Sequence, residues 1–232
     1  MMRQSLAGLI GVWLMAQGAV QAADLSFRPA QGLLRVHTSV ESLQERRWKH
    51  IVKQGIDISC GSATLATILQ YQFGEQVDES ALIRTILNNV KPEDVRQRGG
   101  FSLLDLKRAA TGLGYSVQGY KLPLEALAKM GAPAIVALTV RGRKHFVVFR
   151  GMVGDRVVLA DPAFGNILLK EDDFQAFWQG VALVLKKDGK ERAPSLLSIR
   201  QDDLTTMQIQ ESVHSKLGRE AVVYSVMGAD EF

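Results

Sequence analysis

The spacing of apolar residues changes about halfway along the chain. In the first half they recur every three or four positions, which is the period of an amphipathic helix. In the second half, short apolar runs stand between turn signals, which is typical of buried strands. Helices followed by antiparallel strands predict an α+β fold, with N-terminal helices packed on a C-terminal antiparallel β-sheet.

Local start and stop signals bound the predicted elements. Asp78 precedes one helix and Pro123 opens a short one, while Ser102 forms a capping box before another. Helices are expected over residues 61–74, 78–87, 102–112 or 102–114, and 124–130, with a short one at about 173–178. Strands are expected over 134–140, 145–150, 156–160, 167–169 and 181–185. A tight turn at 151–155 makes the second and third strands a hairpin.

The two ends of the chain carry weaker signals. Residues 23–49 form an irregular lead-in, with a short helix or an extended stretch within 41–53. Beyond the last strand, a weak helical pattern occupies about 204–217, as either a helix packed on the core or a flexible tail. We therefore expect a main domain at 50–186, followed by an extension of unknown role at 187–232.

The first 22 residues have the pattern of a secretory signal peptide. Arg3 supplies a positive charge, residues 6–15 form a short apolar run, and residues 19–22 are mostly small. The apolar run is shorter than the about 20 residues that a membrane-spanning helix needs. We expect a signal peptide at 1–22, export to the periplasm or cell envelope, and no integral membrane protein once the signal is cleaved. An uncleaved anchor is the alternative.

Composition describes an ordinary globular protein and argues against several functions. Of the 232 residues, 47% are hydrophobic and 22% charged, which suits one domain with a full core. The net charge is +4, or +3 once the single basic residue of the signal is removed, and its scattered basic residues do not indicate a nucleic-acid partner. One cysteine and four dispersed histidines lack metal-ligand spacing, and no Gly-rich phosphate loop follows a strand. We expect no metal and no cofactor.

Cys60 is the only cysteine, so an internal disulfide is excluded. A lone thiol in an exported protein is either buried and inert or kept for chemistry. Its position favours chemistry, because Cys60 stands where an irregular segment meets the first strong helix. A thiol at a helix N-terminus lies at the positive end of the helix dipole, which favours the thiolate. Gly61 lets a substrate approach the backbone closely.

A thiolate nucleophile needs a base, and His145 is the best placed of the four histidines. It opens a strand, whereas His37 and His50 lie outside the predicted elements. His214 lies in the uncertain C-terminal segment. Asp161 ends the strand that follows His145. Because a hairpin brings the start of one strand beside the end of the other, we expect His145 and Asp161 to be neighbours.

Together these residues resemble the C39 family of papain-like cysteine peptidases, known for removing leaders at double-glycine sites. The family pattern is a Gln before a Cys-Gly at a helix start, then a His opening a strand and an Asp-Pro after the next strand. The resemblance covers about residues 50–186, and the matching residues are Gln54, Cys60-Gly61, His145 and Asp161-Pro162. The chain is also similar to stand-alone exported members, including the type encoded with Fap-type functional amyloid.

The resemblance implies a papain-like fold and a Cys-His-Asp mechanism. Cys60 would attack the scissile carbonyl, and His145 would take and return the proton. Asp161 would orient His145, while Gln54 and the Cys60 backbone amide would form the oxyanion hole. The substrate would be a polypeptide exported by the same system, such as a functional-amyloid subunit or a secretion-system component.

Two rival functions would use the same fold differently. One is a papain-fold acyltransferase or amidase that takes another acyl donor. The other is a catalytically silent module that binds or chaperones an exported chain, although such a module would not need Cys60, His145 and Asp161 together. Ser59 precedes the cysteine where leader-cleaving transporter domains often carry Asp, so specificity for double-glycine sites is left open.

Overall fold

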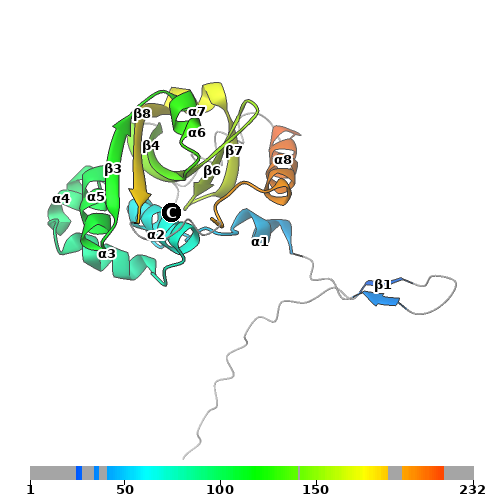
Figure 1. Ribbon diagram of the computed structural model, residues 1–232, viewed down its shortest axis with the longest axis horizontal. Helices are drawn as coiled ribbons and strands as arrows, with labels where there is room; N and C mark the ends of the chain where they lie inside the picture. Colours follow the sequence, from blue (N-terminus) through cyan, green and yellow to red (C-terminus); the bar gives the residue numbers. More distant parts are fainter. Residues whose placement is uncertain (1–24, 28–33, 37–40, 141, 188–194, 217–232) are drawn as a thin grey trace, which may run out of the picture. The chain divides into compact units, whose positions relative to one another are not determined.

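The computed structural model describes residues 25–27, 34–36, 41–140, 142–187 and 195–216 (Figure 1). The chain divides into two compact units, Met1–Glu41 and Ser42–Phe232. In the first unit, β1 (Leu25–Phe27) and β2 (Leu34–Val36) pair as an antiparallel ribbon. The expected signal peptide at 1–22 lies outside the described residues. The residues singled out around Cys60 all belong to the second unit.

The second unit is built around a six-stranded antiparallel sheet. Its strands are β3 (Ser116–Lys121), β4 (Ala134–Val140), β5 (Arg143–Val153), β6 (Arg156–Asp161), β7 (Gly165–Lys170) and β8 (Trp178–Lys186). Their order in the sheet is β3-β8-β4-β5-β6-β7. Strands β4 to β7 form the expected meander, whereas β8 returns to lie between β4 and β3.

Helices α2 (Cys60–Phe73), α3 (Glu79–Leu87) and α5 (Leu103–Gly112) share a core with one face of this sheet (Figure 1). The central helix α2 is buried along most of its length, from Cys60 to Leu69. On β5, Phe146 and Val148 point into this core. The fold therefore consists of helices packed on an antiparallel sheet, as the order of periodicities predicted.

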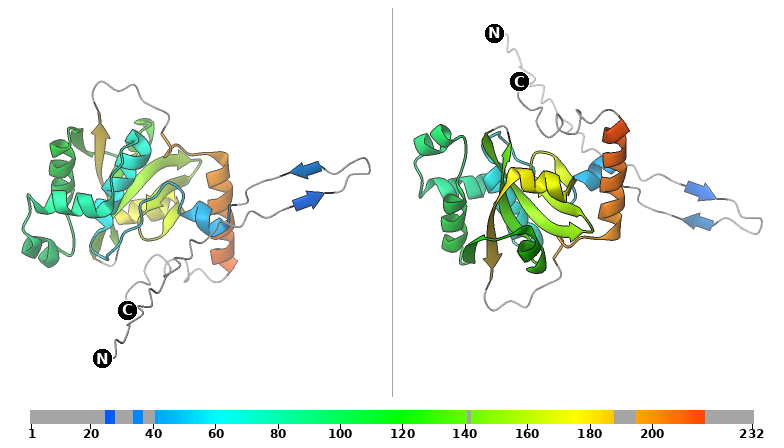
Figure 2. Two further views of the ribbon diagram at one scale, coloured as in Figure 1. Left: turned by 90° about the horizontal axis from the view of Figure 1, so that it is seen from below. Right: turned by 90° about the horizontal axis from the view of Figure 1, so that it is seen from above.

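The opposite face of the sheet is covered as well. Helices α6 (Leu124–Lys129) and α7 (Glu171–Phe177) pack there, as the views from above and below show (Figure 2). Leu127 and Phe174 are fully buried against Val147 and Phe149 of β5. Because both faces are buried, β4 and β5 carry uninterrupted apolar runs instead of alternating apolar and polar residues.

The predicted helix boundaries are confirmed where a local signal marks them. Gly74 ends α2 with a left-handed backbone, at φ 72°. Asp78 accepts a hydrogen bond from the Ala81 amide at the start of α3. The side chains of Ser102 and Asp105 form the expected capping box of α5. Each of these signals acts between residues that are close in the sequence, so the helix end that it marks can be predicted without knowing the tertiary structure.

The strands β1 and β2 were not predicted, because residues 23–49 were expected to be irregular. In the second unit, two further elements were not predicted, because few of their side chains are buried. β3 is an edge strand in which only Val117 is buried. Helix α4 (Pro92–Arg98) buries only Val95. An element that contributes a single residue to the core leaves no periodic signal in the sequence.

The C-terminal segment contains a helix that packs on the sheet. Helix α8 (Gln201–Lys216) contacts β7 and the short helix α1 (Leu43–Arg47). Leu204 and Met207 of α8 form a small apolar cluster with Val158 of β6. Of the two alternatives for this segment, the packed helix is the one observed. Within the described residues, no helix is both long and apolar enough to cross a membrane.

Candidate active site

Cys60 is the first residue of α2, with 7% of its surface exposed. The turn before it is tied by Ser59, whose hydroxyl donates to the Ile56 carbonyl at 2.8 Å and accepts from the Ile56 amide at 3.3 Å. Ser59 is fully buried, so its hydroxyl serves this turn and does not cap the helix. The arrangement holds the Cys60 thiol at the positive end of a 14-residue helix.

The start of α2 is packed closely against its neighbours. A Cβ placed on Gly61 would lie 3.3 Å from side-chain carbons of both Leu106 and Phe146. One turn along the helix, the Thr64 hydroxyl donates a 2.9 Å hydrogen bond to the Phe146 carbonyl oxygen. These contacts join the helix that carries Cys60 to the strand that carries His145. Sequence reasoning missed Thr64; its signal was a polar residue within a mostly apolar helix.

His145 and Asp161 are neighbours, as the hairpin predicted. The His145 Nε2 atom lies 2.8 Å from Oδ2 of Asp161, which is 1% exposed. The second carboxylate oxygen of Asp161 accepts hydrogen bonds from the amides of Ala163 at 2.7 Å and Phe164 at 3.1 Å. Asp161 is therefore held on both oxygens. The nitrogen of His145 left for another partner is Nδ1.

Pairing between β5 and β6 sets this neighbourhood. Val148 is paired with Ala160 and Phe149 with Leu159, after which a β-bulge at Arg150 shifts the register by one residue. A one-residue slip turns side chains to the opposite face of a sheet. The bulge is thus part of what brings His145 and Asp161 to the same place.

The pKa of His145 depends on burial and on its two neighbours, Asp161 and Cys60. Burial opposes protonation of the ring, but the Asp161 carboxylate and the hydrogen-bonded Cys60 side chain outweigh it. Together they raise the pKa of His145 to about 10. In this arrangement His145 is an imidazolium at neutral pH, with the Asp161 carboxylate and the Cys60 sulfur as its two partners. A protonated imidazole beside a cysteine favours the thiolate form, which is the nucleophile in cysteine chemistry.

Gln54 lies beside the turn that follows Asp161. Its backbone amide donates a 3.0 Å hydrogen bond to the carbonyl oxygen of Pro162. Its side-chain Oε1 atom is buried, and no hydrogen bond within the described part of the chain reaches it. Gln54 is therefore held close to the Asp161 turn by its backbone, and its side-chain oxygen accepts no hydrogen bond from the described residues.

His50 is the other histidine whose side chain the structure describes, and its partners lie outside this group. His50 has a left-handed backbone, at φ 58°, and its ring packs against Tyr71 at 5.3 Å between ring centres. Burial, together with the positive charges of Arg200 and Arg150, lowers the pKa of His50. His37 and the side chain of His214 lie outside what the structure describes. Among the described residues, no group of three or more His, Cys, Asp or Glu side chains is arranged to hold a metal ion.

Phe164 is a further residue at the site that sequence reasoning did not single out. Its ring meets the His145 ring edge to face, with 6.4 Å between the ring centres. Phe164 follows the Asp161-Pro162 pair by two residues, and nothing in the local pattern marks it. Its position results from the turn that Asp161 forms with its own neighbours.

Comparison with known sequences gives consistent matches. The profile of the peptidase C39 family matches residues 48–190. The probable functional amyloid protease FapD of Pseudomonas aeruginosa is 37% identical over 190 residues, covering 82% of this chain and 84% of the relative. The protein of the same name from Pseudomonas fluorescens is 37% identical over 184 residues, covering 79% and 81%.

Comparison with solved structures agrees on the fold. The peptidase domain of Streptococcus ComA, a bifunctional ABC transporter, has a TM-score of 0.52 at 22% identity, covering 60% of this chain and 98% of that domain. A double glycine motif protease from an AMS/PCAT transporter, solved with its leader peptide, has a TM-score of 0.50 at 27% identity, covering 59% and 90%. This likeness and the helix-on-sheet architecture define a papain-like α+β fold. From the profile match and the two Pseudomonas relatives, we conclude that the chain is a cysteine peptidase belonging to the peptidase C39 family.

Proposed function

We propose that the chain is an exported thiol peptidase that cleaves a co-exported polypeptide with a Cys60-His145-Asp161 triad. The observation that carries this proposal is the His145 ring, which is bonded to Asp161 at 2.8 Å and is charge-coupled to Cys60 at the start of α2. These are the parts that an activated cysteine needs: a thiolate, a protonated base beside it, and a group that orients the base.

In the acylation step, the Cys60 sulfur attacks the scissile carbonyl carbon. A carbon–sulfur bond forms and the carbonyl π electrons move to the oxygen, producing an oxyanion. When the carbonyl re-forms, the carbon–nitrogen bond breaks, and the His145 imidazolium gives its proton to the departing amine. The product is a thioester on Cys60 and a released polypeptide with a new N-terminus.

In the deacylation step, water takes the place of the departed amine. The now neutral His145 removes a proton from the water, whose oxygen attacks the thioester carbon. Breakage of the carbon–sulfur bond then releases the carboxylic acid product and restores the thiolate beside the imidazolium. Asp161 stays ionised throughout, holding the ring in one orientation and stabilising its positive charge.

The oxyanion formed in both steps is assigned to two donors. The backbone amide of Cys60 lies at the N-terminus of α2, where helix amides have no partner in the preceding turn. The Gln54 side chain is the second donor, because the Gln54 backbone is held beside the Asp161 turn. Donors of this kind act most strongly in a buried site, where they need not reorganise during the reaction.

We assign the substrate to a functional-amyloid export system. The support is that both Pseudomonas relatives, which align over most of their length, are named as probable functional amyloid proteases. We further propose that residues 1–22 direct export to the periplasm or cell envelope, on the strength of Arg3, the apolar run at 6–15 and the small residues at 19–22. The substrate would then meet the peptidase after both have crossed the inner membrane.

Alkylation of Cys60 with iodoacetamide, measured against pH, tests the activated nucleophile. A free thiol has a pKa of about 8.5, so only a small fraction is thiolate at pH 6.5. We expect folded wild type to react at pH 6.5 at least about 10-fold faster than the same chain unfolded in urea. The unfolded chain is a matched control because it presents the same thiol. A folded rate equal to or below the unfolded rate would contradict the proposal.

Incubation with the co-exported amyloid subunit tests the reaction. Wild type should produce two fragments whose masses add up to the subunit plus one water, and Cys60→Ala should produce none. An intact subunit carrying an added acyl group would instead indicate an acyltransferase. Binding without any change of mass, by wild type and Cys60→Ala alike, would indicate a silent binding module.

A further inference from the structure

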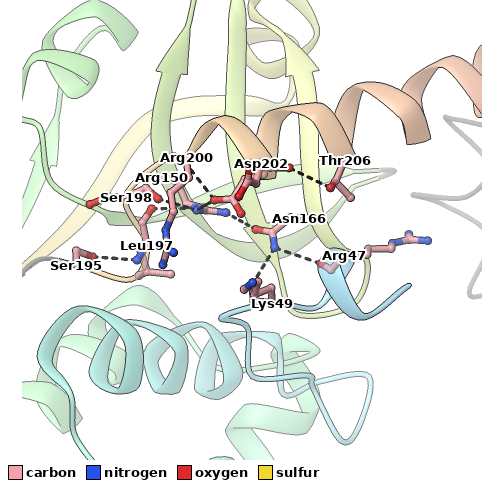
Figure 3. A network of polar contacts seen from close by, with 11 residues as sticks. Arg47, Lys49, Arg150, Asn166, Ser195, Leu197, Ser198, Arg200, Asp202 and Thr206 are labelled. Carbon is pink, nitrogen blue, oxygen red and sulfur yellow. Dashed lines mark hydrogen bonds and ion pairs between the residues drawn. The ribbon is translucent and has the colours of Figure 1, made fainter. Parts of the chain in front are cut away.

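A buried polar network centred on Arg150 connects the C-terminal segment to Asn166 and Arg47 (Figure 3). Arg47 in turn bonds to Phe164, in the turn that carries Asp161. We propose that residues 195–208 form a clamp that positions this turn, residues 161–164, for catalysis, acting through Arg150 and Asn166. The inference rests on the proposed catalytic roles of Cys60, His145 and Asp161. Arg150 and Asn166 are positioning residues, because neither belongs to the triad.

Arg150 is the centre of the network. It is the extra residue of the β-bulge between β5 and β6, and bulges redirect the side chain that they carry. Its side chain is only 1% exposed. The guanidinium donates to Leu197 O at 2.9 Å, Ser198 O at 3.0 Å and Asp203 Oδ2 at 2.7 Å, and to Asn166 Oδ1 at 2.6 Å. Three of the four acceptors belong to the C-terminal segment.

Burial makes this cation dependent on its partners. Burial lowers the pKa of Arg150, while the Asp203 carboxylate opposes that effect. Removing one partner of a buried ion pair leaves an uncompensated charge, which is far more costly than losing an exposed pair. The position of the Arg150 side chain therefore depends on the C-terminal segment staying packed against it. Asp203 lies beyond residue 190, where the match to the family profile ends.

Asn166 links Arg150 to residues 47–49, the segment that precedes the active site in the chain. Its side-chain oxygen accepts from Arg150, and its side-chain nitrogen donates to the carbonyl oxygens of Arg47 at 3.2 Å and Lys49 at 2.9 Å. Asn166 is 2% exposed, so its own side chain is shielded from water. In Figure 3 the labelled side chains of Arg150 and Asn166 point toward each other, with Arg47 and Lys49 beyond them.

Arg47 completes the path to Asp161. Its Nε atom donates to the carbonyl oxygen of Phe164, the last residue of the turn. The amides of Ala163 and Phe164 in turn donate to Asp161. The next residue, Gly165, approaches so closely that a Cβ there would lie 2.6 Å from the Arg47 carbonyl oxygen. The orientation of Asp161 thus depends on contacts that begin at α8.

The test compares Asp203→Asn with Asp202→Asn in the full chain. Both variants remove one negative charge from the first turn of α8, but Asp202 is exposed, whereas Asp203 bonds to Arg150. Hydrogen exchange of the Ala163 and Phe164 amides reports on the turn, and exchange of the Val148 amide in the central sheet reports on global stability. We expect Asp203→Asn to accelerate exchange at Ala163 and Phe164 at least about 10-fold more than at Val148.

The same variants are compared by kinetics. Displacing a catalytic group by about 1 Å can cost on the order of 100-fold in rate, so we expect kcat and Cys60 alkylation at pH 6.5 to fall between 10- and 100-fold in Asp203→Asn. KM should change little, and Asp202→Asn should match wild type. Asn166→Leu, which removes the link while leaving Asp203 in place, should show the same kinetic losses.

Two results would overturn the clamp. One is equal acceleration of exchange at all three amides in Asp203→Asn, which would show a purely structural role. The other is wild-type exchange and kinetics in Asn166→Leu. Slow alkylation of the wild-type Cys60 would instead refute the proposed nucleophile, and the exchange measurements would still decide whether the C-terminal segment controls the turn.

Discussion

The Thr64 hydroxyl donates a 2.9 Å hydrogen bond to the carbonyl oxygen of Phe146, and both groups are buried. Thr64 lies one turn after Cys60 on α2, and Phe146 follows His145 on β5. The bond therefore joins the two elements that carry the proposed nucleophile and its base. It limits movement of α2 along β5, and therefore helps to set the distance between the Cys60 thiol and the His145 imidazole.

Replacing Thr64 with valine should weaken both stability and catalysis. Valine keeps the shape but leaves the Phe146 carbonyl without this donor, which costs about 1–3 kcal/mol in free energy of unfolding. We expect kcat to fall about 10-fold or more, because the loss loosens α2 against β5. Denaturant unfolding and steady-state kinetics measure the two effects. Thr85→Val is the control, since the Thr85 hydroxyl bonds only to Ala81 of its own helix among the contacts described. Equal effects in both variants would refute this role for Thr64.

Replacing Asp161 with asparagine should change the pH dependence of cleavage. The Asp161 charge helps raise the pKa of His145 to about 10, and loss of that charge lowers it. His145 must be protonated to serve the leaving amine, so the descending limb of kcat/KM should move from near pH 10 toward neutrality. The rate at pH 7 should fall about 100-fold. A limb that stays near pH 10 in Asp161→Asn would show that another group sets it.

Replacing Gln54 with alanine should slow catalysis without unfolding the protein. The backbone amide that bonds to Pro162 is retained in the variant, so the loop should keep its position. Loss of one oxyanion donor typically lowers kcat on the order of 100-fold, with KM little changed. Gln72→Ala is a matched control, because Gln72 also has a buried Oε1 without a partner among the described residues but lies near the far end of α2. Similar kinetics for the two variants would remove Gln54 from the oxyanion hole.

Replacing Gly165 with alanine should be far more damaging than the same change at Gly154. Both glycines have left-handed backbones, with φ of 85° and 60°, so each substitution costs about 1–2 kcal/mol from the conformation alone. At Gly165 the added Cβ would also lie 2.6 Å from the Arg47 carbonyl oxygen, whereas at Gly154 nothing lies within 4 Å. Thermal unfolding should show a much larger loss for Gly165→Ala. Equal losses would mean that the backbone near Arg47 adjusts freely.

Much of the local structure could be predicted because its causes are local. The capping box of Ser102, the left-handed Gly74 and the apolar runs of β4 and β5 each act within a few residues. The proximity of His145 and Asp161 was also predictable, since a hairpin joins strands separated by a short turn. The strand order was less accessible, because the return of β8 to β4 involves segments about 45 residues apart.

The sequence by itself determined most of the buried helices and strands, the helix start at Cys60 and the hairpin that pairs His145 with Asp161. Only the tertiary structure decided which helix residue meets which strand residue, as Thr64 meets Phe146 across 82 positions. It also decided that Arg150 binds Asp203, 53 positions away, so that α8 packs on the sheet. Contacts of this kind depend on the packing of whole layers, so they leave no periodic or spacing signal in the residues that make them.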